Sequence, residues 1–193
     1  MVKEAALRYN WVSPQDYLAA ERVAEEKHEY FDGEVVKMQG GSLKHNRIVA
    51  SILKHAGNQL EGKPCEVLPS DMRTSSPGFQ SYSYPDVIIV CGEAEFSGDE
   101  NDVLQNPLVI FEVVSRTSVN TDYGRKLLFY RQIPSLMEYV LINSFDKVEV
   151  DIYRRFQEAW ALETYKGLEE VLRLDSIKVE IPLSEIYKNI TFD

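Results

Sequence analysis

The runs YPDVIIV, at residues 84–90, and NPLVIFEVVS, at residues 106–115, decide the fold together with TDYGRKLLFYRQ at residues 121–132. Both runs are almost continuously apolar, which is the pattern of β-strands in a sheet that is covered on both faces. The third segment carries apolar residues at helical spacing. The stretch therefore predicts two buried strands and a helix that packs against them.

Each of these strands contains a single acidic residue, Asp86 in the first and Glu112 in the second. A carboxylate in an apolar run costs several kcal/mol unless a neighbouring group neutralises it, and such a cost is a large share of the stability of a protein. Because successive side chains of a strand point to opposite faces, pairing of the two strands can bring both carboxylates to one point. The two acids predict a divalent cation bound between them.

The helical segment that follows supplies a lysine. Asp122 and Lys126 are four residues apart and share one face of a helix. Lys126 also borders the apolar stripe of Tyr123, Leu127 and Tyr130. Its ammonium is therefore expected to point toward the sheet rather than toward water.

Pro85-Asp86, Glu112 and a later lysine resemble the signature of the PD-(D/E)xK nuclease superfamily. Over most of its length the chain resembles a bacterial family of putative restriction endonucleases in that superfamily, through HEYFDGEVVKM, SLKHNRI, YPDVIIV, LVIFEVVS and DYGRKLLFYR in this order. The resemblance implies a restriction-endonuclease-like fold of the α/β class. Its central mixed β-sheet lies between helices, and we expect one domain over residues 1–193, with a C-terminal antiparallel extension.

The sequence departs from the superfamily signature at two positions. The lysine of the signature, two residues after the second acid, would fall at Val114. The resemblance implies that this lysine has moved to the helix as Lys126. Arg116 stands where the related pattern often has proline, which is a loop position of little consequence.

We expect the site to hydrolyse phosphodiester bonds of DNA with the help of a metal ion. Asp86, Glu112 and the backbone carbonyl of Val113 would hold Mg²⁺ or Mn²⁺ through hard oxygen ligands. Lys126 would orient or deprotonate the attacking water and offset charge on the phosphate. Asp122 would orient Lys126.

Three further residues are expected near this site. The resemblance implies that Glu29, just before the Asp32-Gly33 turn, approaches the metal; the alternative is a carboxylate on the hairpin face or a partner of a nearby lysine. His45 lies in the first turn of a helix, where a neutral imidazole is favoured, and it can donate to a phosphate or a carboxylate. A satisfied interior histidine is the alternative. Arg125 is expected to contact the substrate.

Other functions remain open from the residues alone. Asp86 could cap loop amides at the start of its strand, and Glu112 could form a buried ion pair with Lys126 that needs no metal. The chain could then be a noncatalytic relic of the nuclease fold that acts as an interaction module. A metal-dependent phosphoesterase that acts on RNA or a small substrate is the third possibility, since the net charge of −10 suits it better than DNA.

The rest of the sequence predicts the elements around this core. Ser13-Pro14 begins a helix that runs to about Glu26, Asp32-Gly33 makes a hairpin turn, and Ser42 caps a helix from about Leu43 to Leu60. Residues 65–68 and 72–74 are expected to be short strands, followed by a loop whose aromatic residues include Phe79. After residue 137 the sequence predicts further strands, a hairpin and a short final helix.

The bulk properties bound the class of protein. The chain has 193 residues, of which 44% are apolar, and no run approaches the ~20 apolar residues that span a bilayer. With no apolar leader at its N-terminus, we expect a cytoplasmic protein. Cys65 and Cys91 indicate neither a disulfide nor a zinc site. DNA binding would need the 21 basic residues to be unevenly spread, with the acidic loop at residues 92–106 away from the DNA. Cutting two strands suggests a homodimer.

Overall fold

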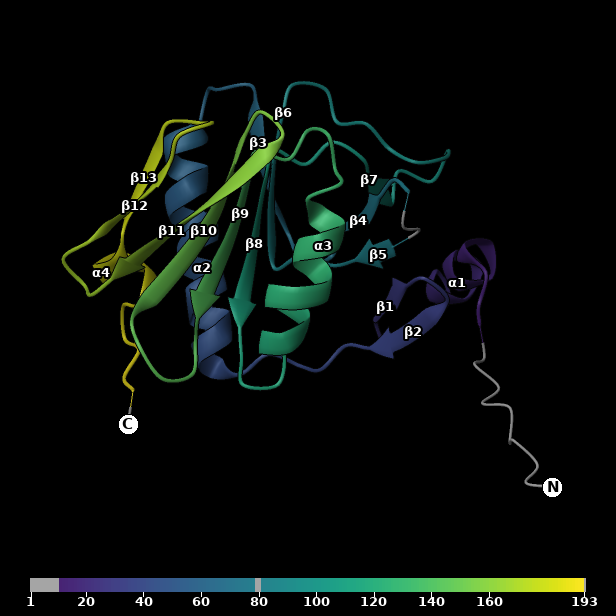
Figure 1. Cartoon of the computed structure of the whole chain (residues 1–193), viewed down its shortest axis with the longest axis horizontal. Coiled ribbons are helices and arrows are strands. Elements are labelled where there is room, and N and C mark those ends of the chain that lie inside the picture. The colour runs from purple at the N-terminus through teal and green to yellow at the C-terminus, as the bar shows by residue number, and fades with distance from the viewer. Residues whose placement is uncertain (1–10, 79–80, 193) are drawn as a thin grey trace.

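Six strands form a mixed sheet on which most of the chain packs (Figure 1). The computed structural model describes residues 11–78 and 81–192. Only the central pair β8–β9 is parallel, and the other neighbours are antiparallel. In sheet order the strands are β11 (Ala159–Lys166), β10 (Glu149–Phe156), β9 (Glu138–Asn143), β8 (Val109–Val114), β6 (Val87–Cys91) and β3 (Cys65–Pro69).

Helices cover both faces of this sheet (Figure 1). On one face lies α2 (Leu43–Leu60), capped by the Ser42 side chain. Its buried stripe of Ile48, Ile52, Ala56 and Leu60, which the sequence predicts, packs on alternate residues of β6 and β8. On the other face lie η1 (Thr121–Lys126), which is a π-helix, and its continuation α3 (Leu127–Tyr130). Coverage on both faces explains why β6 and β8 are apolar throughout.

A second sheet of five short strands packs beside the first. Its order is β2 (Glu34–Lys37), β1 (His28–Phe31), β5 (Ser81–Ser83), β4 (Arg73–Ser76) and β7 (Val103–Leu104). The β1–β2 turn confirms the Asp32-Gly33 prediction, because both residues have positive φ, 48° and 91°, as a tight hairpin turn requires. Ser13 caps α1 (Pro14–Glu21), which ends earlier than predicted.

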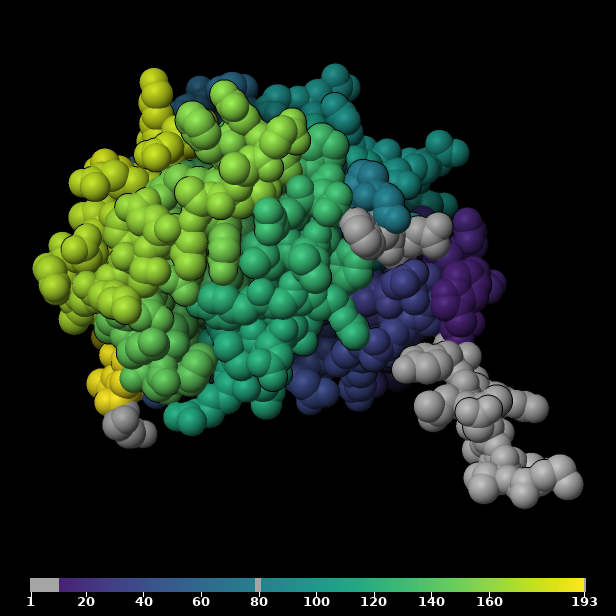
Figure 2. All heavy atoms as spheres, viewed as in Figure 1, coloured from purple at the N-terminus to yellow at the C-terminus, as the bar shows by residue number. Residues whose placement is uncertain are grey.

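The C-terminal part forms the predicted antiparallel extension. The hairpin β10–β11 continues the large sheet, and β12 (Val171–Leu174) pairs with β13 (Val179–Pro182) before the short helix α4 (Leu183–Ile186). Figure 2 shows this region at the left of the molecule and α1 at the right. The class of the fold is confirmed, although the strands are divided among three sheets where the sequence predicts one central sheet.

The prediction that the cysteines form no disulfide was wrong. Cys65 and Cys91 occupy paired positions of β3 and β6 and form a disulfide, with their Cα atoms 4.0 Å apart. They are 26 residues apart in the sequence, and only the pairing of the two strands brings them together. Cys91 also packs beside the apolar core, as its position in a buried strand predicts.

Two predictions concern residues that the structure does not describe. The expectation that no apolar leader is present concerns residues 1–10, and the expectation of an aromatic loop includes Phe79. Within residues 11–78 and 81–192, no helix is long and apolar enough to cross a membrane.

Candidate active site

The register of β6 and β8 places the two strand acids opposite each other. Val87 pairs with Phe111 and Ile88 with Ile110, so the same antiparallel register, continued by one residue, sets Asp86 across from Glu112. Asp86 directly precedes β6, whereas Glu112 lies inside β8. Both residues are buried, with exposed fractions of 9% and 4%.

Asp86 is held on both of its carboxylate oxygens. Its Oδ2 accepts a hydrogen bond of 2.7 Å from the backbone N–H of Val113, and its Oδ1 lies 3.0 Å from Nε2 of His45. Asp86 therefore accepts from an amide inside the neighbouring strand β8, and not from the loop amides that the alternative named, and it also contacts a histidine. Gly41 leaves room for the imidazole, because a Cβ at Gly41 would lie 2.6 Å from Nδ1 of His45.

Lys126 lies at the centre of the acidic groups. Its Nζ is 2.9 Å from Oε1 of Glu112 and 2.9 Å from Oε1 of Glu29. Oδ1 of Asp122 is 3.7 Å away on the same helix. The side chain is only 6% exposed, so its ammonium points toward the sheet and not toward water. Glu29 thus contacts Lys126 and neither Lys27 nor Lys37.

Three acidic side chains surround the single ammonium of Lys126. Burial alone would lower the pKa of Lys126, but Glu112, Glu29 and Asp122 raise it well above its ordinary value and keep the ammonium charged. Burial raises the pKa of Glu112 well above its usual range, and the nearby acids, Asp86 among them, add to that rise. Burial also raises the pKa of Asp122. A nearby cation would favour the ionised form of these carboxyl groups and lower their pKa.

The π-helical turn η1 positions the lysine. π-Helical turns are rare overall, and those that do occur are often found at functional sites. Here Thr121–Lys126 forms one such turn, and the hydroxyl of Tyr139 donates to the carbonyl of Asp122 at 3.0 Å. The start of η1, the end of β8 and the start of α2 lie at the same edge of the sheet (Figure 1). The site is therefore assembled from segments that are far apart in the sequence.

Two hydroxyl groups that the sequence analysis did not assign also belong to the cluster. The hydroxyl of Tyr130 donates to Oε1 of Glu112 at 2.8 Å and receives a hydrogen bond of 3.0 Å from Ser83. The sequence places Tyr130 in an apolar helical stripe, where a tyrosine is expected to pack with its ring. Nothing in the sequence indicates that its hydroxyl binds a carboxylate. Ser83 belongs to β5, where the sequence predicts a loop.

Arg125 lies at the edge of the site with its guanidinium occupied. Its Nη1 is 2.9 Å from Oε2 of Glu34, and the group stacks 5.1 Å from the ring centre of Phe31. This side chain remains 43% exposed, whereas Lys126 next to it is buried. Arg125 is thus available to solvent near the cluster but makes no contact with the four buried carboxylates.

The donor set fits a hard divalent cation with few protein ligands. In the part of the chain that the structure describes, no three His, Cys, Asp or Glu side chains are arranged to hold a metal. Mg²⁺ is commonly bound through one or two carboxylates and keeps several waters. Asp86 and Glu112 are two buried carboxyl groups that face each other across paired strands.

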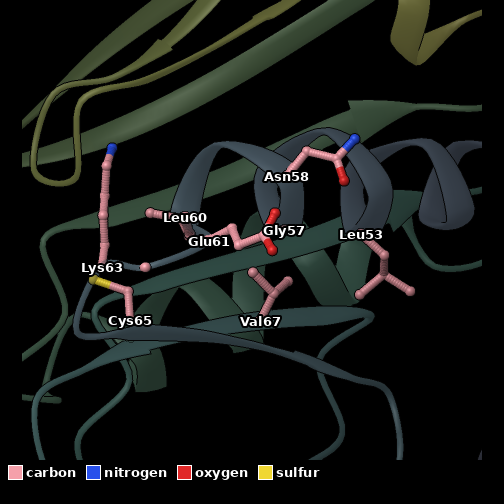
Figure 3. A pocket seen from close by; sticks show the side chains of 9 residues that line it. Leu53, Gly57, Asn58, Leu60, Glu61, Lys63, Cys65 and Val67 are labelled. Atoms are coloured by element: carbon pink, nitrogen blue, oxygen red, sulfur yellow. The ribbon is translucent and has the colours of Figure 1, made fainter.

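A separate cavity lies outside the cluster. It has a volume of about 500 Å³ and is formed by the C-terminal half of α2 and the edge strand β3 (Figure 3). Leu53, Leu60 and Val67 line it, with Glu61 and Lys63 near its rim. None of the acidic cluster residues contributes to it.

The fold of the chain is shared with a solved protein. A crystal structure titled as a putative nuclease belonging to DUF820, from Anabaena variabilis, matches with a TM-score of 0.74 over 91% of this chain and 97% of that chain. The two sequences are 14% identical, so this likeness establishes the fold alone.

Sequence comparison gives the family. A family model described as "Uma2: Putative restriction endonuclease" matches residues 14–184, and the chain belongs to this family. The uncharacterized protein slr1290 of Synechocystis is 32% identical over 182 residues, or 94% of each chain. A second uncharacterized Synechocystis protein, sll1609, is 32% identical over 165 residues, which are 85% of this chain and 93% of that protein.

Proposed function

We propose that this protein is a metal-dependent endonuclease that hydrolyses phosphodiester bonds of DNA. The observation that carries the proposal is the contact of Lys126 with Glu112, beside Asp86, in a buried cluster whose acids outnumber its fixed cation. The family, whose description names restriction endonucleases, agrees with this chemistry. The cation is Mg²⁺ or Mn²⁺.

Two side chains and one carbonyl hold the ion in this proposal. Asp86 and Glu112 provide carboxylate oxygens, and Val113 provides its backbone carbonyl. A divalent cation lowers the pKa of a bound water and stabilises charge on a phosphate oxygen. The N–H of Val113 fixes Asp86 at 2.7 Å, and His45 holds its other oxygen, so the carboxylate is oriented before any ion arrives.

Lys126 orients the attacking water and offsets the charge that builds up on the phosphate. Because its pKa is raised well above the ordinary value, Lys126 acts as a cation and not as the base that removes a proton. Glu29 and Asp122 contact its ammonium and position it. Because Glu29 contacts Lys126, its carboxylate would also lie close to the proposed metal site and could bind the ion directly or through water.

Substrate phosphates are contacted from the edge where β8 ends. Arg125 borders Lys126, Lys44 borders His45, and Arg116 follows β8 by two residues. The predicted acidic loop at residues 92–106 in fact contains the buried strand β7. Its acidic first part follows the other end of β6 and lies at the opposite end of the strands (Figure 1). This separation favours the proposal, because a basic surface for phosphates would need the acidic segment to lie elsewhere. Cutting both strands of a duplex would use two copies of the chain.

The test is Mg²⁺- or Mn²⁺-dependent nicking of supercoiled plasmid DNA by the full chain. Asp86→Ala, Glu112→Ala and Lys126→Ala are assayed beside it, with Arg173→Ala as a control whose side chain pairs with Glu180 outside the site. We expect nicking by the wild type and the control only. Equal activity in all five proteins would contradict the proposal, since the activity would then come from another site or a contaminant.

Two other functions are distinguished when metal binding is measured by calorimetry beside the nicking assay. Metal binding without DNA cleavage favours a phosphoesterase that acts on RNA or a small substrate, which the acidic chain tolerates better. Absence of both metal binding and cleavage favours a noncatalytic relic in which Lys126 alone neutralises Glu112. Only variants whose folding has been verified by circular dichroism are used for these conclusions.

A further inference from the structure

A buried hydroxyl relay ends on Glu112. Ser83 Oγ donates to the hydroxyl of Tyr130 at 3.0 Å, and that hydroxyl donates to Oε1 of Glu112 at 2.8 Å. Tyr130 and Ser83 are 2% and 3% exposed, so water does not compete for these bonds. The ring of Tyr130 is held at its edge by Tyr139, with ring centres 5.1 Å apart.

The direction of the relay follows from the acceptor at its end. As a ligand of a cation, Glu112 is ionised and can only accept hydrogen bonds. The hydroxyl of Tyr130 therefore donates its proton to the hydrogen bond with Glu112. The phenol oxygen accepts the hydrogen bond that Ser83 donates. Ser83 thus adds a second hydrogen bond to the phenol oxygen and helps to hold the hydroxyl in its bond to Glu112.

The relay also selects between the two oxygens of Glu112. Oε1 receives both Tyr130 and Lys126, at 2.8 Å and 2.9 Å, which uses the acceptor directions of that oxygen. Oε2 is then the oxygen left for a metal ion.

We propose that Tyr130, held by Ser83, is a positioning residue that presents Oε2 of Glu112 to the divalent cation. This inference rests on the proposed function, because it assigns a role toward the ion held by Asp86 and Glu112. Partners that orient a metal ligand typically contribute ten- to a hundred-fold in metal affinity. Tyr130 acts through Glu112 and touches neither ion nor substrate.

The test is calorimetric titration of Mn²⁺ into the full chain, without DNA. Tyr130→Phe keeps the ring and removes the hydroxyl, and we expect the dissociation constant to rise roughly ten-fold or more. Tyr187→Phe is the matched control, since its buried hydroxyl bonds the carbonyl of Glu149 at 2.6 Å away from the cluster. We expect the affinity of this control to equal that of the wild type.

Ser83→Ala separates positioning from packing. It should weaken Mn²⁺ binding less than Tyr130→Phe does, because the phenol still reaches Glu112 but is no longer fixed. The double variant should bind as weakly as Tyr130→Phe alone, since Ser83 acts only through the hydroxyl. Additive losses, in which Ser83→Ala weakens binding further when Tyr130→Phe is already present, would overturn the relay.

The remaining outcomes distinguish this inference from the proposed function. If the wild type binds Mn²⁺, Glu112→Gln abolishes binding and Tyr130→Phe binds normally, the relay is wrong and the metal site stands. If the wild type binds no Mn²⁺, both are wrong. A Tyr130→Phe protein that fails to fold leaves Ser83→Ala to decide, and normal affinity in Ser83→Ala would then count against the relay.

Discussion

Lys126 contacts Glu112 across two elements, with Nζ 2.9 Å from Oε1, although the signature lysine of the superfamily would lie at position 114 on the same strand. Val114 occupies that position and is buried among Ile110, Tyr130 and Tyr139. The ammonium of Lys126 instead reaches Glu112 from the π-helical turn η1. In the proposed site, Lys126 takes the place of the signature lysine from a different backbone position.

Removing the lysine should cost stability. Lys126→Met leaves Glu112 and Glu29 buried without their cation, and breaking a buried pair costs roughly 3–5 kcal/mol. Urea unfolding measures the loss. Arg125→Met is the control, because its partner Glu34 is on the surface and such pairs contribute about 1 kcal/mol or less. Equal losses in both variants would show that the buried cluster is not held by Lys126.

Gly41 should matter for activity through His45. A Cβ at position 41 would lie 2.6 Å from Nδ1 of the imidazole, so Gly41→Ala must displace the ring from Asp86. We expect plasmid nicking to fall on the order of ten- to a hundred-fold, as small misplacements in a site can cause. Gly40→Ala, with no atom within 4 Å of the added Cβ, is the control and should keep full activity. Wild-type nicking by Gly41→Ala would argue against a role for His45.

Asp102 should make part of the stability depend on pH. Hydrogen bonding to Arg22, at 2.8 Å, and the charge of Arg73 lower the pKa of its carboxyl. A lowered pKa stabilises the fold above the unfolded carboxyl pKa of about 3.9, and this contribution is lost as pH falls through the lower folded value. Asp102→Asn should therefore cost about 2 kcal/mol at neutral pH. Urea unfolding from about pH 7 to about pH 3 should show the difference from wild type shrinking; a constant difference would contradict this.

The disulfide should stabilise the edge of the large sheet. Cys65 and Cys91 close a loop with a separation of 26 residues, and such a cross-link typically contributes about 2–4 kcal/mol. The variant with both Cys65→Ser and Cys91→Ser should lose that amount in urea unfolding. Dithiothreitol should destabilise the wild type and leave this variant unchanged. Free thiols in the untreated native protein, found by thiol titration, would contradict the bond.

Much of the fold follows from local signals in the sequence. The apolar runs of β6 and β8, the Asp32-Gly33 turn and the capped stripe of α2 depend on neighbouring residues alone, and each is where the sequence predicts. The resemblance of the motifs to the nuclease family added the fold class. The family itself is now established by the match over residues 14–184.

The structural features that the sequence does not predict depend on tertiary contacts. The Cys65–Cys91 bond requires the β3–β6 register, and the contacts of Lys126 with two of its three acids join residues that are far apart in the sequence. Tyr130 reads as an apolar stripe residue because only the fold shows that its hydroxyl meets Glu112. The positions of Asp86, Glu112 and Lys126 agree with the expected cluster, while their catalytic and metal-binding roles stay a prediction.

The most direct test is the thermal stability of the full chain with and without Mn²⁺, for the wild type and for Asp86→Asn. An ion that binds only the folded state at a hundred times its dissociation constant adds about 2.7 kcal/mol, which raises the melting temperature on the order of 5 °C. We predict this rise for the wild type and none for Asp86→Asn. The same rise in both proteins, or in neither, would contradict a cation held between Asp86 and Glu112.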